Sequence, residues 1–92
     1  MNEQVKEMLL NNMVDNLPTL RKKLNMSQDD LAKIIGVGRS TISNIESKRN
    51  SMTWNMFLSL LLIFTKNEET NKLLNVMEIY TDELNDLIKQ RQ

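Results

Sequence analysis

The fold is decided by the stretch Gln28-Asp29-Asp30-Leu31-Ala32-Lys33-Ile34-Ile35-Gly36-Val37-Gly38-Arg39-Ser40-Thr41-Ile42-Ser43-Asn44-Ile45-Glu46. Gly36 and Gly38 permit backbone angles that other residues resist, so they predict a tight turn between two short helices. We expect these helices over residues 28–35 and 39–47. Because helices joined by so short a turn cross closely, their contact point needs a small side chain, which Ala32 supplies.

The second of these helices has two different sides. Val37, Ile42 and Ile45 fall on its inward side. An α-helix with a polar, short-chained and acid-free outward face fits the major groove of B-DNA, where Arg can contact guanine and Asn adenine. An ordinary solvent-exposed face is the alternative interpretation. The outward residues, our candidates for DNA base contacts, are Arg39, Ser40, Ser43 and Asn44.

Composition excludes most enzyme classes. A chain with no His and no Cys has no zinc site of the usual type, no His acid–base catalyst, no thiol nucleophile and no disulfide. Two glycines are too few for a phosphate-binding loop or a dinucleotide fingerprint. We therefore expect no enzymatic activity, no metal and no cofactor, and no small-molecule ligand is evident.

No segment looks like a signal peptide or a membrane span. The first residues are polar and of mixed charge, unlike the basic and then apolar pattern of a secretory signal. The longest apolar stretch, residues 56–64, contains a Ser and is far shorter than the ~20 residues of a membrane span. We expect a cytoplasmic protein with no membrane partner.

The residues before the turn predict two helices. An apolar stripe from Val5 to Met13 marks a short first helix within residues 1–15. Pro18 suits the first turn of a further helix, because its missing N–H has no intrahelical partner there. We therefore expect a second helix to begin near Leu17.

The residues after Trp54 are strongly apolar. Helix 54–65 is apolar on nearly every side, which requires nearly complete burial. Residues 67–92 form one helix or two, and their apolar positions recur at the spacing of a heptad seam. A tail packed on its own domain and an intermolecular contact are equally good interpretations. We expect a homodimer held by helix 54–65 and the tail. The seam positions are Leu73, Met77, Tyr80, Leu84 and Leu87.

From about residue 16 to residue 64, the chain resembles the helix-turn-helix domain of the phage-repressor and Cro-like (Xre) regulators. The resemblance implies an all-α, lambda-repressor-like bundle of about five helices, with an extra N-terminal helix over 1–15. The helix-turn-helix domain would cover 16–66, and 67–92 would be a helical extension for packing and dimerisation. The residues that carry the resemblance are Ser27, Gln28, Ala32, Gly36, Ile42, Ile45 and Glu46.

The resemblance also implies roles for residues around the turn. Arg21 and Glu46 match a structural salt bridge between the first and third helices. Relatives often carry Ser or Thr at the position of Gly38. In this chain the backbone N–H groups at the start of the helix remain free for an anion. Relatives often carry a helix-ending Gly at Lys48, so we expect this helix to run longer or to end less tightly. The implied DNA phosphate contacts are Ser27, Gln28, Gly38, Lys48 and Arg49.

Two functions are consistent with these features. The first is a sequence-specific DNA-binding transcriptional regulator, a repressor, which inserts helix 39–47 into double-stranded DNA as a dimer on a palindromic operator. The second is an antitoxin-like or accessory protein-interaction module that uses the apolar C-terminal half. The acid-free face favours the first function, and the apolar surface after Trp54 favours the second.

Charge is distributed unevenly along a chain whose formal net charge is zero. Residues 21–49 carry seven basic and three acidic side chains, a local charge of +4. Residues 1–20 carry −2 and residues 67–92 carry −3. The basic segment coincides with the two-helix motif, and the acidic segments would be repelled from phosphate. The distribution therefore predicts which side of the molecule faces DNA.

Overall fold

The computed structural model describes residues 1–89, and this part of the chain contains six helices. No strand occurs in this range, which confirms the expected all-α fold. Residues 90–92, the end of the expected extension, lie outside the described residues. The helices are α1 (Glu3–Lys23), α2 (Gln28–Ile35), α3 (Arg39–Glu46), α4 (Trp54–Lys66), α5 (Glu68–Val76) and α6 (Asp82–Ile88).

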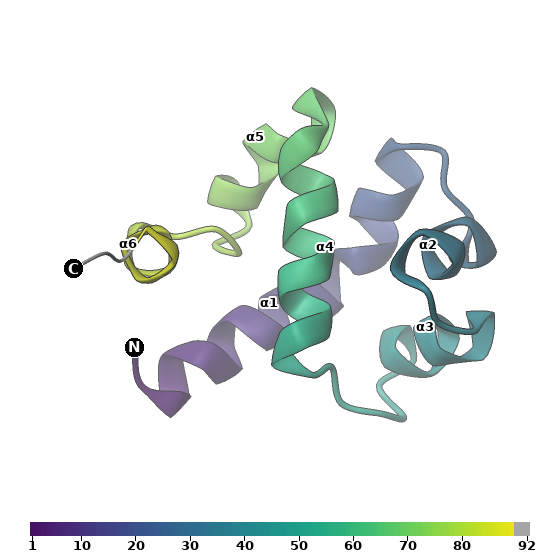
Figure 1. Cartoon of the computed structure of the whole chain (residues 1–92), viewed down its shortest axis with the longest axis horizontal. Helices are drawn as coiled ribbons and strands as arrows, with labels where there is room; N and C mark the ends of the chain where they lie inside the picture. The colour runs from purple at the N-terminus through teal and green to yellow at the C-terminus, as the bar shows by residue number, and fades with distance from the viewer. Residues whose placement is uncertain (90–92) are drawn as a thin grey trace.

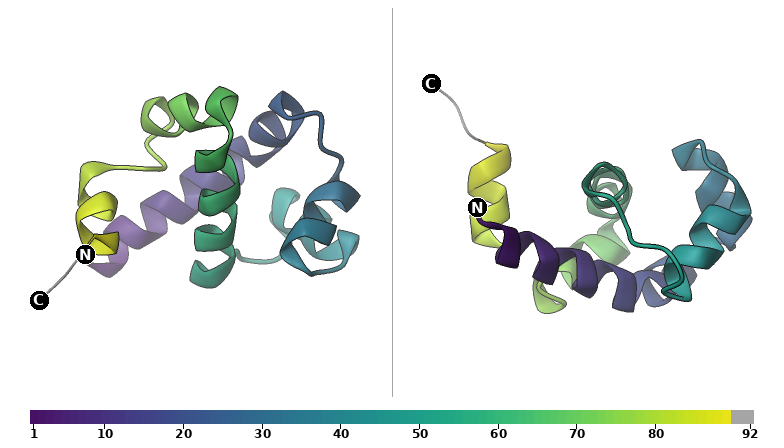
Figure 2. Two further views of the ribbon diagram at one scale, coloured as in Figure 1. Left: turned by 45° about the horizontal axis from the view of Figure 1, so that its top comes forward. Right: turned by 90° about the horizontal axis from the view of Figure 1, so that it is seen from below.

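The long helix α1 organises the others. It runs along one side of the molecule, and α4 lies across it (Figures 1 and 2). Helices α2 and α3 lie near the C-terminal end of α1, whereas α6 lies beside its N-terminal end (Figure 2). One cluster of buried apolar side chains extends through all six helices. Within the described residues, no helix is both long enough and apolar enough to cross a membrane.

Helix α1 continues through the position where a break was expected. The prediction of one helix over 1–15 and another starting near Leu17 is wrong, because Pro18 lies inside α1. An internal Pro costs about 3 kcal/mol of helix stability. Complete burial of one large apolar side chain stabilises by about 1.5–3 kcal/mol. The single stripe that keeps α1 continuous has four fully buried side chains, Leu9, Met13, Leu17 and Leu20.

The starts of α2, α3 and α4 agree with the sequence-based expectation. Helix α2 has the expected bounds, and α3 starts at Arg39 but ends one residue early, at Glu46. Thr53 caps α4, because its hydroxyl accepts a hydrogen bond from the Met56 N–H at 3.1 Å. These local signals lie within a few residues of the boundary that they set, so the sequence is sufficient to place them.

The tail forms two helices and no heptad seam. Helix α5 ends at Val76, and Glu78 adopts a left-handed backbone with φ 56°. The Asn12 side-chain amide on α1 donates to the Glu78 carbonyl at 3.0 Å and ties this break to the domain. Ile79 and Leu84 are fully buried. The tail therefore packs against its own domain.

The buried tail residue Leu84 generates a stability prediction. Leu84→Ala should lower the free energy of unfolding by about 2–5 kcal/mol, because it leaves a cavity in the shared core. Leu87→Ala on the same helix should cost about 1 kcal/mol or less, because Leu87 is 38% exposed. Urea denaturation followed by circular dichroism measures both, and a loss for Leu84→Ala as small as that for Leu87→Ala would show that α6 is not part of the core.

Candidate nucleic-acid interface

The turn between α2 and α3 depends on one glycine. Gly36 adopts a left-handed backbone with φ 91°, and the N–H groups of Gly36 and Val37 both donate to the Ala32 carbonyl, at 2.8 and 3.0 Å. Gly38 has an extended backbone, φ −78° and ψ 156°, which any residue adopts. A side chain would also fit there, since the nearest atom to an added Cβ is the Ser40 hydroxyl at 3.9 Å. Of the two glycines, only Gly36 therefore adopts a conformation that favours glycine.

The structure brings the four candidate base-contact residues onto one side of α3. Ile42 and Ile45 are buried on the opposite side and fix the rotation of the helix about its own axis. The outward side contains no acidic residue. Two of its side chains, Arg39 and Ser40, are exposed, whereas Ser43 and Asn44 are half-buried.

The N-terminus of α3 has no side-chain cap. Gly38 is the N-cap residue, and no side chain accepts a hydrogen bond from the first turn. The first N–H groups of a helix have no intrahelical partner and carry the positive end of the helix dipole. The N–H groups of this terminus can consequently donate hydrogen bonds to an anion such as a phosphate group.

A nearly buried ion pair fixes α3 against α1. The Arg21 Nε donates to Glu46 Oε2 at 2.9 Å, and a second guanidinium nitrogen donates to Oε1 at 3.0 Å. The two side chains are only 11% and 8% exposed. A third guanidinium nitrogen donates to the Met26 carbonyl at 3.0 Å, so all three nitrogens are used. Arg21 therefore connects the end of α1 to the loop between α1 and α2 and to the last residue of α3.

The two candidate phosphate contacts at the start of α2 have protein partners. The Gln28 side-chain amide donates to Glu46 Oε1 at 3.0 Å. The Ser27 hydroxyl accepts from the Asp30 N–H, and the Ser27 N–H donates to the Asp30 carboxylate, each at 3.0 Å. Hydrogen bonds from the Ser27 backbone N–H and then from its hydroxyl hold the pKa of Asp30 below its ordinary value. This cap is therefore present at neutral pH and is lost as the pH falls through the lowered pKa.

The loop after α3 turns sharply. Lys48 adopts a left-handed backbone with φ 67°. Its N–H donates to the Ile45 carbonyl at 3.0 Å, and the Arg49 N–H donates to the Asn44 carbonyl at 2.9 Å. The expectation of a longer or less tightly ended helix is wrong, because these bonds end α3 as a glycine at this position would.

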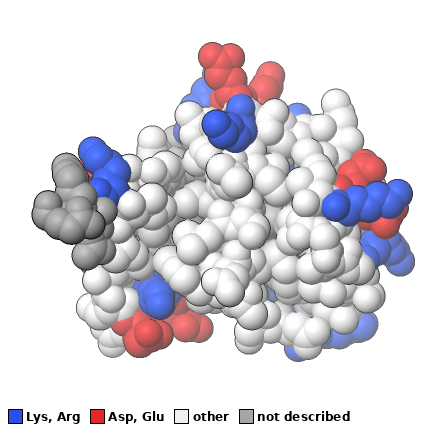
Figure 3. Space-filling model, viewed as in Figure 1, with Lys and Arg blue, Asp and Glu red and all other residues white. Residues whose placement is uncertain are grey.

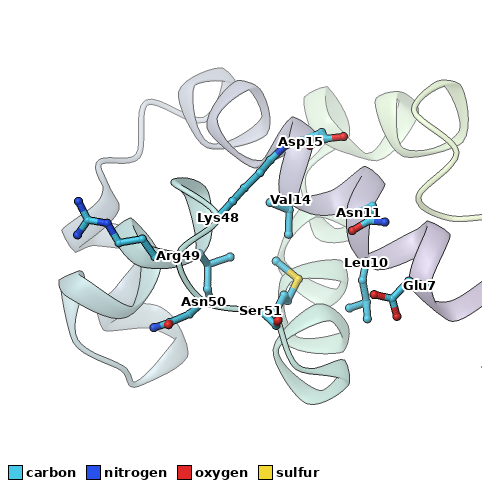
Figure 4. Close-up of a pocket in the computed structure, with 11 residues that line it drawn as sticks. Glu7, Leu10, Asn11, Val14, Asp15, Lys48, Arg49, Asn50 and Ser51 are labelled. Carbon is cyan, nitrogen blue, oxygen red and sulfur yellow. Dashed lines mark ion pairs between the residues drawn. The ribbon is translucent and has the colours of Figure 1, made fainter.

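The side chains of this loop point in different directions. The Lys48 ammonium lies 2.8 Å from the Asp15 carboxylate on α1. Arg49 is exposed and points away from α1 (Figure 4). Sequence reasoning missed Asp15, because its contact with Lys48 depends on where the middle of α1 passes the loop.

Comparison with known families identifies this region. Residues 19–53 match the model of a family described as helix-turn-helix. The match begins in the last part of α1, includes α2 and α3, and ends at the residue that caps α4. No significant match to this chain was found among curated proteins or solved structures.

The ion pair between α1 and α3 generates a second stability prediction. Arg21→Met leaves the Glu46 carboxylate buried without its partner and should cost about 3–5 kcal/mol of unfolding free energy. The double variant Arg21→Met/Glu46→Leu removes both charges and should recover most of this loss. Urea denaturation of the wild type, of Arg21→Met, of Glu46→Leu and of the double variant measures the coupling, and losses that simply add would contradict it.

Proposed function

Because residues 19–53 belong to the helix-turn-helix family of Cro-like (Xre) regulators, we propose that the protein is a sequence-specific DNA-binding transcriptional repressor. Helix α3 enters the major groove with its acid-free side toward the bases. The observation that supports this function best is the position of Arg39, Ser40, Ser43 and Asn44 on one side of a helix that is fixed from behind.

Each polar residue on this side has a role that follows from its chemistry. Arg39 is exposed in the first turn of α3 and can make two hydrogen bonds to a guanine edge. Asn44 lies further along α3 and can make two to an adenine edge. Ser40 and Ser43 are short enough to let the helix lie deep in the groove.

The phosphate contacts are proposed at the two ends of α3 and at the start of α2. The uncapped N–H groups at Gly38 and the exposed guanidinium of Arg49 are free to take a phosphate oxygen each. The Gln28 amide keeps one hydrogen for donation beyond its bond to Glu46, whereas the Ser27 hydroxyl has to turn its hydrogen from Asp30 toward the phosphate. Lys48 can contribute once it leaves Asp15.

We propose that the protein binds its operator as a homodimer through the outer side of α4. Asn55, Ser59 and Leu62 are the exposed positions of the first nine residues of this helix, and none is charged. The face of the molecule over α4 is correspondingly free of Lys, Arg, Asp and Glu across its centre (Figure 3). Leu62 is 61% exposed there. Two copies can approach on such a face without charge repulsion and place two α3 helices on half-sites of a palindrome.

An accessory protein-interaction module is the second candidate function. The exposed apolar side chains of the C-terminal half favour it, since Leu62 is 61% and Val76 80% exposed. These two residues lie on different helices, α4 and α5. DNA binding would then be secondary or absent.

Arg39 provides the test of base recognition. Arg39→Ala should weaken binding to the preferred duplex by about 1–3 kcal/mol and relax discrimination at one base pair. Lys72→Ala removes the same charge from α5, away from α3, and should leave that discrimination unchanged. Fluorescence anisotropy with the preferred duplex and its single-base variants measures both. An unchanged affinity of Arg39→Ala would show that α3 does not read the bases.

Leu62 provides the test of the dimer. Leu62→Lys places a charge on the uncharged face and should shift the protein toward monomer in analytical ultracentrifugation. Val76→Lys makes the same change at an exposed apolar residue on α5 and should leave the dimer intact. A wild-type protein that sediments as a monomer at high concentration would contradict the proposed dimer.

A further inference from the structure

The ion pair between Asp15 and Lys48 joins α1 to the loop that follows the proposed recognition helix. We propose that Asp15 competes with DNA phosphate for Lys48 and thereby weakens the sequence-independent part of DNA binding. The inference rests on the proposed function, because it describes how that same surface is regulated. Asp15 lies outside residues 19–53, the segment that matches the helix-turn-helix family.

The backbone of Lys48 is in a conformation that favours glycine. A left-handed conformation costs a residue with a side chain about 1–2 kcal/mol relative to glycine. The hydrogen bonds that end α3 here involve only backbone atoms, so the helix end does not need a lysine. What the side chain contributes is its ammonium, which lies 2.8 Å from the Asp15 carboxylate.

The Lys48 side chain points toward α1 (Figure 4). A surface hollow of about 470 Å³ lies between α1 and the loop, and Glu7, Val14 and Asp15 are among the residues that line it from α1. Lys48 extends from the loop to Asp15, whereas Arg49 points away from α1 (Figure 4). A phosphate contact by Lys48 therefore requires that its ammonium leave the carboxylate.

The ion pair between Lys48 and Asp15 is weak enough for DNA phosphate to break it. The Lys48 and Asp15 side chains are 67% and 53% exposed, so the pair is worth only about 0.2–1 kcal/mol. A pair of this strength holds Lys48 for about three-fifths to four-fifths of the time. DNA phosphate can break the pair. The free energy needed to break it lowers the affinity for every duplex, whatever its sequence.

The removal of the Asp15 charge tests the competition. Asp15→Asn should bind a labelled duplex of mixed sequence about 2–6-fold more tightly, the factor that corresponds to release of the pair. Because Lys48 then contacts phosphate in a larger fraction of the complexes, the dependence of log K on log salt should also steepen, by at most about 0.9 for each protomer. Fluorescence anisotropy titrations between about 50 and 200 mM salt measure both quantities.

Two further variants separate competition from a general effect of charge. Glu7→Gln removes the same charge from the same hollow, but Lys48 forms its ion pair with Asp15 and not with Glu7. This variant should therefore change affinity less and leave the salt dependence unchanged. The double variant Asp15→Asn/Lys48→Gln should lose the gain of Asp15→Asn. Equal gains for Asp15→Asn and Glu7→Gln, or a gain that persists in the double variant, would overturn the inference.

DNA binding by the wild-type protein separates a failure of the proposed role of Asp15 from a failure of the proposed function. If it binds DNA and Asp15→Asn binds with the same affinity and salt dependence, the inference fails while the proposed function stands. If it binds neither mixed-sequence duplexes nor any selected sequence, the proposed function fails and the inference with it.

Discussion

The ion pair between Arg21 and Glu46 is the interaction on which the candidate interface depends. Helix α3 has eight residues, too few to be stable alone in water, and its buried residues are Ile42 and Ile45. The bidentate contact adds directional restraint, because it fixes the last residue of α3 to α1 at two atoms. The polar side of α3 can therefore face outward in one orientation before any ligand is bound.

Helix α1 extends far beyond the segment that matches the helix-turn-helix family. The part of the chain that matches the helix-turn-helix family begins at residue 19, but its supporting helix begins at Glu3. The N-terminal half of α1 packs beside the tail, and the middle of α1 carries Asp15 to the loop after α3. The residues before the family segment therefore contribute both to the core and to the proposed control of DNA affinity.

The sequence was sufficient for features set by neighbouring residues and insufficient for those set by distant ones. The two glycines of the turn predicted α2 and the start of α3, and the apolar segment that begins at Trp54 predicted the start of α4. The continuity of α1 through Pro18 was missed, because burial against other helices outweighs the local preference of proline. The sequence left open whether residues 67–92 form one helix or two, because the turn at Glu78 is tied to α1 by a hydrogen bond from a residue far away in the chain. On the candidate interface, the outward side of α3 was predictable, but the partner of Lys48 was not.

The central claim is that the acid-free side of α3 reads DNA bases. Selection of bound sequences from a pool of random duplexes at physiological salt tests this claim most directly. The account predicts that the wild-type protein enriches a palindrome whose half-sites lie about one helical turn apart. Enrichment of no common sequence by a folded protein would contradict it.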